Sequence, residues 1–206
     1  MIEEALPLDY VHKPSAKVKR LGDWSLRDAI TACAEKDDSR GKEWIYKKYY
    51  GYLMSVIFRY IKDAYDAEEL VNEAFLKGFR AISRFKIQGD QSDIERPFMS
   101  WLSRIASNVC IDHLRAKKAL YLVEDNTELE TQDNMVLPTQ DLEINEILNL
   151  LNRLPEIQRV IFVLFEIEGY SHEEVSAQLD IPESTSRTYL TRAKQKLRMY
   201  YKKLYS

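Results

Sequence analysis

Cysteine, histidine, glycine and proline are all scarce in this chain of 206 residues, which contains two, three, six and six of them. Cys33 and Cys110 do not form a Cys-x-x-Cys pair, so we expect buried free thiols in a reducing compartment. His12, His113 and His172 have no second ligand at metal spacing, and no metal site is predicted. Because glycine and proline punctuate the turns between short strands, their scarcity favours long helices.

Several signals of enzymes and membrane proteins are also missing. The sequence has no Gly-rich phosphate loop and no set of a nucleophile with its base, so we predict no catalytic residues, no cofactor and no enzymatic activity. It has no charged-then-apolar signal segment and no apolar run of membrane-spanning length. We therefore expect a cytoplasmic protein that does not insert into a membrane.

The charge balance limits how the chain can meet nucleic acid. A net charge of -3 and a pI near 5.8 exclude a uniformly basic coat. Any DNA-binding surface must therefore be local and offset by acid elsewhere.

The most informative stretch runs from Ser171 to Arg198 and predicts two helices joined by a tight turn. Ser171 can cap the first helix, and Glu174 can complete a capping box three residues later. The turn follows because Asp180 tolerates turn conformations and Pro182 suits the first position of a helix. This pattern is typical of a helix-turn-helix.

The second helix of this pair, from Ser184 to Ser206, is basic and contains no Asp or Glu. A helix of this kind fits the major groove, with short polar side chains near its N-terminus and cations for the phosphates. The alternative is a solvated basic face on an ordinary helix pair, and this stretch alone does not separate the two.

Residues 63–85 predict a helix with a core stripe on one side and acid on the other. The macrodipole alone favours acid at a helix start. Five carboxylates exceed what a cap requires, so we interpret them as a face offered to a basic partner protein. They are Asp63, Asp66, Glu68, Glu69 and Glu73.

A further helix is predicted from Pro97 to about Lys118, after a polar loop over residues 86–96. Phe98 and Trp101 lie beside cations and an amide, which are the components needed to stack on unpaired bases and to neutralise phosphates. A packed tryptophan and a solvated basic end would explain the pattern equally well. The polar side chains of this helix are Arg104, Asn108, Arg115, Lys117 and Lys118.

Two segments show no regular apolar period. Residues 1–24 are interpreted as a loosely ordered N-terminal arm, and residues 119–141, which have several carboxylates and no Lys or Arg, as a flexible acidic linker. The sequence therefore predicts an all-α protein of two small helical domains, residues 25–118 and 142–206, the second with the helix-turn-helix.

Two sets of residues together resemble the bacterial RNA polymerase sigma factors of the extracytoplasmic function type. The first domain carries Asp66-Ala67-Glu68-Glu69-Leu70-Val71-Asn72-Glu73, Trp101-Leu102, Arg104-Ile105-Ala106, Asn108, Asp112 and Arg115. The second carries Leu154-Pro155, Arg159, Phe162, Leu164, Glu168-Gly169-Tyr170-Ser171, Glu174-Val175, Thr185, Arg192-Ala193-Lys194 and Leu197-Arg198. Two separate signatures in the expected order argue against chance similarity.

The resemblance implies a factor that binds core RNA polymerase and directs promoter recognition and melting. It implies that Asp66, Glu69, Leu70 and Glu73 dock on the clamp helices of the largest polymerase subunit. It assigns Phe98, Trp101, Arg104, Asn108 and Arg115 to the -10 promoter element, and Ser184, Thr185, Arg187, Thr188, Arg192 and Lys196 to the -35 element. The implied partners are core polymerase, with its flap on the second domain, promoter DNA and an anti-sigma factor, with no small-molecule substrate.

The chain also departs from the family pattern. Ser184 stands where glycine is frequent, Ser186 where an apolar residue is usual, Tyr189 where arginine is common, and Asp180 replaces a turn glycine. The loop before Phe98, which in the family helps to choose the -10 base, is several residues longer than usual. No -10 sequence and no base-by-base reading of the -35 element are therefore predicted.

Two other classes of protein are weighed against this interpretation. A stand-alone helix-turn-helix regulator would share the C-terminal half, but residues 25–118 show neither alternating strands nor a phosphate-acceptor pocket. An enzyme would need the catalytic groups that the chain lacks.

Overall fold

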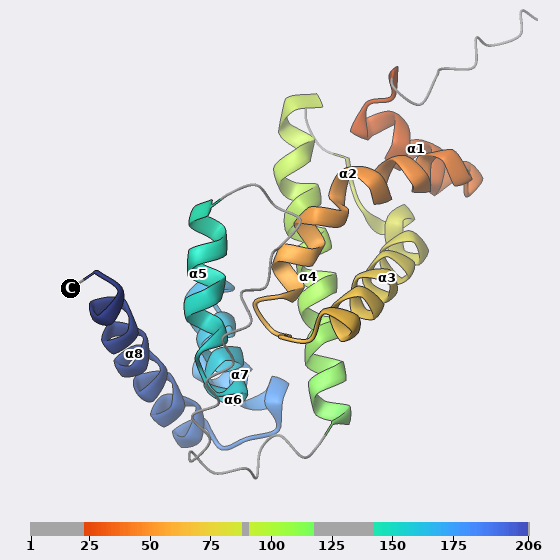
Figure 1. Cartoon of the computed structure of the whole chain (residues 1–206). Helices are drawn as coiled ribbons and strands as arrows, with labels where there is room; N and C mark the ends of the chain where they lie inside the picture. The colour runs from red at the N-terminus through yellow and green to blue at the C-terminus, as the bar shows by residue number, and fades with distance from the viewer. Residues whose placement is uncertain (1–22, 88–90, 118–141, 206) are drawn as a thin grey trace, which may run out of the picture.

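The computed structural model describes residues 23–87, 91–117 and 142–205, and all regular structure within them is helical (Figure 1). The predicted all-α class is thus confirmed. The predicted linker and nearly all of the predicted N-terminal arm lie outside the described residues. The first half contains α1 (Leu26–Lys36), α2 (Ser39–Ile57), α3 (Ala64–Ala81), the short 3-10 helix η2 (Ile82–Arg84) and α4 (Gln91–Ala116). The second half contains α5 (Leu142–Asn152), α6 (Glu156–Phe162), the π-helical turn η4 (Val163–Ile167), α7 (His172–Leu179) and α8 (Glu183–Tyr205).

The first helix, α1, begins with a capping box formed by Ser25 and Asp28. The Ser25 hydroxyl accepts the backbone N–H of Asp28, and the Asp28 carboxylate accepts the backbone N–H of Ser25. This capping box satisfies two donors that would otherwise have no partner at the helix start. Leu26, Ile30 and Cys33 are all buried on the inner face of this helix.

Aromatic residues of α2 contribute to the packing of the first half. Tyr49 is buried, and the Tyr46 ring lies 4.7 Å from the ring of Phe75 on α3. The helix ends at Ile57. The chain turns there because Tyr60 enters the core, where it is fully buried and donates its hydroxyl to Ser107 of α4.

The start of α4 corrects a prediction. The helix begins at Gln91 rather than at Pro97, so part of the expected loop is helical. Ile94 is buried, and the Glu95 carboxylate accepts the hydroxyl of Tyr49 at 3.2 Å and pairs with Lys48 at 2.8 Å. These contacts with α2 stabilise the extra turns, and Pro97 removes only one backbone donor near the helix start.

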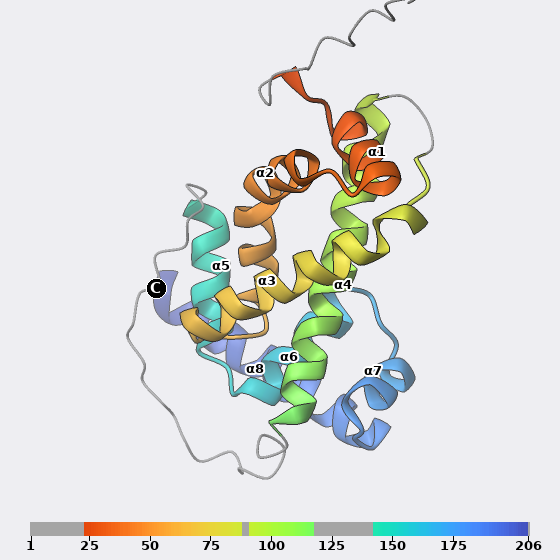
Figure 2. The same cartoon turned by 90° about the vertical axis from the view of Figure 1, so that its right-hand side faces the viewer.

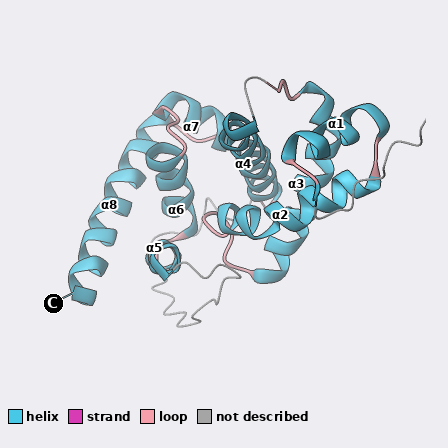
Figure 3. Ribbon diagram, turned by 90° about the horizontal axis from the view of Figure 1, so that it is seen from above, coloured by secondary structure: helices cyan, strands magenta, loops and turns pink. Residues whose placement is uncertain are grey.

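The helices pack into one body. In the first half α2, α3 and α4 pack on one another and α1 crosses α2, as the two side views show (Figures 1 and 2). In the second half α6, α7 and α5 pack along α8. Seen from above, α4 lies between the first three helices and the second half (Figure 3). The buried apolar residues of both halves form one continuous cluster.

Candidate nucleic-acid interface

The helix-turn-helix predicted from Ser171 onward is present in α7 and α8. Ser171 and Glu174 form the expected capping box at the start of α7. Asp180 ends this helix in the left-handed conformation, with φ of 53°, which aspartate tolerates better than most residues. Ser176 donates its hydroxyl to the carbonyl of Ile181 at 2.5 Å and closes the turn. The local sequence therefore determines this turn.

The N-terminal part of α8 presents a polar face. Ser184, Arg187, Thr188 and Arg192 are exposed, whereas Thr185 and Lys196 are half-buried. Two of these side chains have partners on their own helix: Arg187 pairs with Glu183, and Thr188 donates its hydroxyl to the carbonyl of Ser184 at 2.9 Å. The Arg192 guanidinium lies 5.7 Å from the Tyr189 ring centroid. All six predicted -35 residues thus lie on one helix.

Ser186 points to the inner side of α8 and is fully buried. Its hydroxyl lies 2.9 Å from Nδ1 of His172 on α7, and the His172 ring stacks on Phe165 with centroids 4.3 Å apart. Partial burial and the nearby Arg187 charge hold the pKa of His172 below its usual value. The hydrogen bond explains how a polar residue replaces the usual apolar one at this position. The departure at Ser186 is visible in the sequence, but its partner is not, because fourteen residues separate Ser186 from His172.

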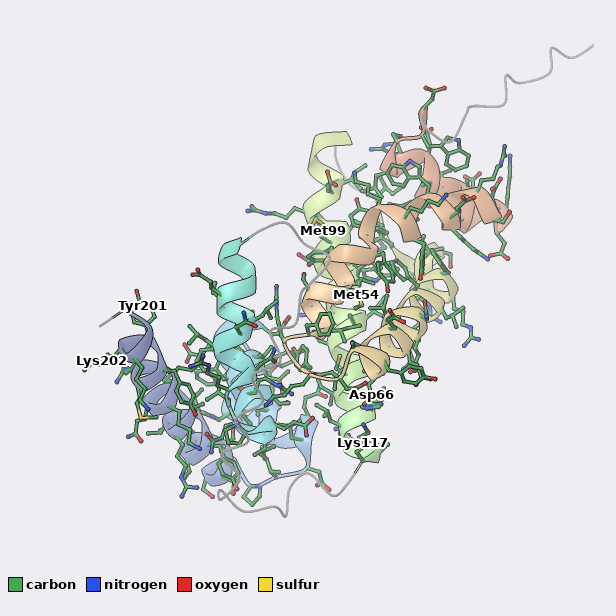
Figure 4. The ribbon with its side chains drawn as sticks, viewed as in Figure 1. Met54, Asp66, Met99, Lys117, Tyr201 and Lys202 are labelled. Carbon is green, nitrogen blue, oxygen red and sulfur yellow. The ribbon has the colours of Figure 1, made fainter. Side chains whose placement is uncertain are left out.

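The acidic face predicted on α3 lies mostly at the surface, because four of its five carboxylates are exposed and only Asp66 is half-buried. Glu69 and Glu73 are exposed, but Leu70 is 3% exposed and belongs to the core. The Asp66 carboxylate turns toward α4, where Lys117 donates to it at 2.6 Å (Figure 4). This hydrogen bond is the main reason why the pKa of Asp66 lies below its usual value. The direct partner-binding role expected of Leu70 does not fit this conformation.

Two exposed apolar residues of α3 were missed from the sequence. Tyr65 is 72% exposed and Leu76 is 57% exposed. At helical spacing they lie on the same face as Glu69 and Glu73. Their exposure could have been predicted, because neither residue belongs to the core stripe of this helix. The acidic face therefore has an apolar component at both ends.

Three predicted -10 residues share a face of α4. Arg104, Asn108 and Arg115 are exposed and follow one another at helical spacing. Trp101 lies on the same side but is half-buried, with its ring 5.4 Å from Phe85 and 5.6 Å from Phe98. Phe98 is fully buried. The expectation that Phe98 stacks on a base is corrected: its ring supports Trp101 from the core.

Arg115 joins this face to the helix-turn-helix. Its Nε donates to the carbonyl of Gln178 at 2.5 Å and its Nη2 to the carbonyl of Ala177 at 3.0 Å. Both carbonyls lie in the last turn of α7, where backbone acceptors lack partners within the helix. The cation also complements the negative end of the helix dipole. A residue predicted to bind DNA is thus engaged within the protein.

Other kinds of site find little support among the described residues. They contain no group of three or more His, Cys, Asp or Glu that could hold a metal ion. Cys33 and Cys110 are both free and buried, and burial raises the pKa of Cys33 to about 11. None of the helices in the described ranges has the length and apolar character required to cross a bilayer.

Comparisons with known proteins find matches to both halves of the chain. A family model described as Sigma-70 region 2 matches residues 45–120, and one described as Sigma-70, region 4 matches residues 144–197. The RNA polymerase sigma-H factor of Pseudomonas aeruginosa is 27% identical over 175 residues, covering 78% of this chain and 86% of that protein. The ECF RNA polymerase sigma factor SigW of Bacillus subtilis is 30% identical over 158 residues, covering 71% and 81%. A solved structure of the sigma factor RpoE from Bartonella quintana, in complex with the anti-sigma factor NepR, matches with 18% identity and a TM-score of 0.45, covering 78% of this chain and 96% of that chain.

A helical protein that combines sigma regions 2 and 4 is a transcription initiation factor that recognises promoters for RNA polymerase. This chain belongs to the sigma-70 family, in its extracytoplasmic function group. The family resemblance drawn from the two sets of residues is confirmed.

Proposed function

We propose that this sigma factor uses three separate surfaces, one each for core polymerase, the -10 element and the -35 element. The observation that carries the proposal is that exposed faces of opposite charge occur on α3 and on α4 and α8, at the positions that the family resemblance assigns. The proposed domains are residues 25–118 for region 2, 119–141 for the linker and 142–206 for region 4. The protein would act in the cytoplasm with core polymerase.

The polymerase-binding surface is the exposed stripe of α3. Glu69 supplies charge for a basic partner, and Leu76 supplies apolar area that the partner can desolvate. Glu73 is exposed too, but it already pairs with Lys77 at 2.9 Å and would have to exchange this cation for one of the partner's. In an interface with an apolar centre and a charged rim, the apolar centre contributes affinity and the charged rim orients the partners. Asp66 would contribute less, because Lys117 already neutralises it.

The -10 surface is the polar side of α4. Arg104 and Asn108 are exposed and able to meet phosphates and base edges, while the half-buried Trp101 offers ring surface for a base released from the duplex. Stacking of one base on an aromatic ring contributes about 1 to 3 kcal/mol, which can offset part of the cost of unpairing. Melting would thus be driven by binding energy, and the polymerase would perform the chemistry.

The -35 surface is the N-terminal half of α8. Ser184, Arg187 and Thr188 lie where a recognition helix contacts base edges, and Arg192 lies farther along the exposed side. The cations near the C-terminal end of the helix would bind phosphates and fix the register.

A groove between α5 and α8 is the proposed site for the polymerase flap. It has a volume of about 440 Å³ and an apolar floor that includes Leu151, Phe162 and Leu197. Tyr201 and Lys202 border it and point away from the body of the protein (Figure 4). An anti-sigma factor would compete for one or more of these surfaces.

Run-off transcription tests the proposal directly. Purified bacterial core polymerase is supplied with a pool of genomic promoter fragments, with and without this protein. Transcripts that appear only with the protein, and whose start sites share upstream motifs, are the expected result. The absence of new transcripts with the cognate polymerase would contradict the proposal and favour a stand-alone DNA-binding protein.

A further inference from the structure

The groove between α5 and α8 combines an apolar interior with a cationic rim. Ile147 and Tyr201 line it, and each is 56% exposed. Arg198 and Lys202 line the same groove and are exposed as well. Among the described residues, the ion pairs of α8 lie earlier in the helix and include neither of these two cations. The groove therefore suits a segment that carries both apolar side chains and carboxylates.

The linker of the same chain has this composition. Residues 119–141 contain several carboxylates and no Lys or Arg. Toward the end of this segment Met135, Val136 and Leu137 form an apolar run, and Asp133 precedes it. The run can fill an apolar groove while the carboxylate before it meets the cations of the rim.

The position of this run along the chain places it within reach of the groove. The linker leads into α5, whose first residue is Leu142, and the start of α5 lies toward the same end of the molecule as the last turn of α8 (Figure 1). Ile147 and Leu151 lie five and nine residues after Leu142, or about 8 and 14 Å along the helix axis. The five residues 137–141 span about 17 Å when extended. A chain that turns back at the start of α5 therefore brings the run to the level of the groove.

Other occupants of the groove have a weaker claim. A second apolar run, residues 120–123, lies at the other end of the linker, and residues 124–141 separate it from α5. A separate protein molecule would lose its translational freedom on binding. A tethered segment avoids most of this loss, because a short flexible tether gives it an effective concentration in the millimolar range.

We propose that residues 133–141 dock in the α5–α8 groove of the same molecule, with Met135, Val136 and Leu137 on its apolar floor and Asp133 beside the cations of its rim. The docked segment covers the proposed site of the polymerase flap, so the segment and the flap compete for one groove. This competition rests on the proposed function, whereas the docking itself does not. Core polymerase therefore captures the free protein more weakly than an open groove would allow.

Disulfide trapping tests the docking in the full-length chain without polymerase. Val136→Cys and Ile147→Cys are combined and the protein is mildly oxidised. The fraction of chains whose new thiols escape later alkylation by N-ethylmaleimide is then followed by mass spectrometry. Cys33 and Cys110 compete little, because both are buried and burial raises the pKa of each thiol. The docked run should bring the two new thiols into contact and give rapid cross-linking.

Val136→Cys with Glu146→Cys is the matched control, because Glu146 is exposed on the same helix and does not line the groove. The two pairs close loops of nearly equal length, so chain entropy alone predicts equal rates. Docking predicts that the pair with Ile147→Cys reacts at least tenfold faster. Equal rates for the two pairs would overturn the proposal. Faster trapping of Ile147→Cys by Leu122→Cys than by Val136→Cys would also overturn it, in favour of the first apolar run.

The cationic rim provides an independent check on the trapping. Lys202→Glu should slow the cross-linking of the groove pair several-fold, because it repels the carboxylates of the linker. Lys203→Glu makes the same change at a neighbouring exposed lysine that does not line this groove, and it should have little effect. Equal slowing by both variants would show a general effect of charge and would contradict docking at the rim.

Binding to core polymerase distinguishes the docking from the proposed function. Met135→Ser combined with Leu137→Ser removes the apolar run and should strengthen binding about tenfold if nine tenths of the free protein is masked. Leu129→Ser, elsewhere in the linker, is the control and should bind like the wild type. Excess core polymerase should also slow the cross-linking of the groove pair. If this pair cross-links rapidly but polymerase has neither effect, the docking stands and the proposed flap site is wrong.

Discussion

The Lys117 ammonium at the end of α4 donates to the Asp66 carboxylate at the start of α3 at 2.6 Å. Nε2 of His113 lies 3.7 Å from the same carboxylate. This contact fixes the end of the proposed -10 helix to the beginning of the proposed polymerase-binding helix. The Asp66 carboxylate thus adds a polar contact to the packing of α3 on α4, which holds the two proposed surfaces in one orientation.

Asp66→Asn should lower the free energy of unfolding at pH 7 by about 1 kcal/mol or less, because the pair is partly solvated. The pKa of Asp66 is lower in the folded state than in the unfolded state, so its contribution is present above the unfolded value near 4 and is lost as the pH falls through the folded value. Urea unfolding at pH 7 and at pH 2.5 should therefore show a difference from wild type that shrinks in acid. Glu35→Gln, at an exposed carboxyl on α1, is the control. A difference of equal size at both pH values would contradict the assignment.

Ser186→Ala should destabilise the protein by about 1 kcal/mol, because it leaves Nδ1 of His172 without its hydrogen-bond partner. It should also weaken -35 binding more than this loss of stability explains, since Ser186 helps to fix the position of α8 on α7. The measurements are thermal unfolding and promoter binding by the holoenzyme at 25 °C. Thr191→Ala, on the exposed side of the same helix, is the matched control.

The same pair predicts a pH dependence. The pKa of His172 is lower in the folded state than the ordinary value of 6.5, so the unfolded state binds protons more readily between these values. Stability should be full above pH 6.5 and should fall as the pH drops below that value. His172→Gln should remove this part of the dependence. An unchanged slope between pH 5 and 7 would count against neutral His172 in the fold.

How much of the fold and of the proposed surfaces could be predicted from the sequence depends on how far apart in the chain the interacting residues lie. The α7 cap, the Asp180 turn and the polar face of α8 follow from residues within a few positions of one another, and the sequence predicts all three. The acidic helix and the polar side of α4 are likewise visible in helical periodicity.

The predictions fail where contacts between residues far apart in the sequence determine the structure. Glu95 and Ile94 extend α4 past Pro97 because they meet α2, about 46 positions earlier in the chain. The sequence places Phe98 among the residues for stacking on unpaired bases, but periodicity alone does not show that it packs against Phe85 and Tyr49. The burial of Arg159 against Tyr60 joins residues 99 positions apart, and no local pattern indicates it.

Leu76→Ser should weaken binding to core polymerase by about tenfold or less while leaving stability nearly unchanged, because the side chain is 57% exposed in the free protein. Glu69→Lys should weaken binding more strongly at low salt, since it reverses a charge that steers association. Both effects can be measured by surface plasmon resonance at two ionic strengths. Ile167→Ser, an exposed apolar residue on η4, should bind like the wild type. Co-purification of Glu69→Lys at wild-type levels under all salt conditions would remove α3 from the interface.

Arg187→Ala tests how α8 reads the -35 element. The guanidinium is exposed and pairs with Glu183, so it must exchange this partner for DNA. If Arg187 contacts a base edge, its loss should cost about 1 to 3 kcal/mol of binding and relax specificity at one position. If it contacts phosphate, binding should weaken for all sequences and the salt dependence should fall. These outcomes can be separated by letting single-base variants of the promoter compete with the original promoter for binding to the holoenzyme. Equal promoter binding by the mutant and the wild type would show that Arg187 does not touch the promoter. Glu183→Gln should bind at least as tightly as the wild type, because it removes the competing carboxylate.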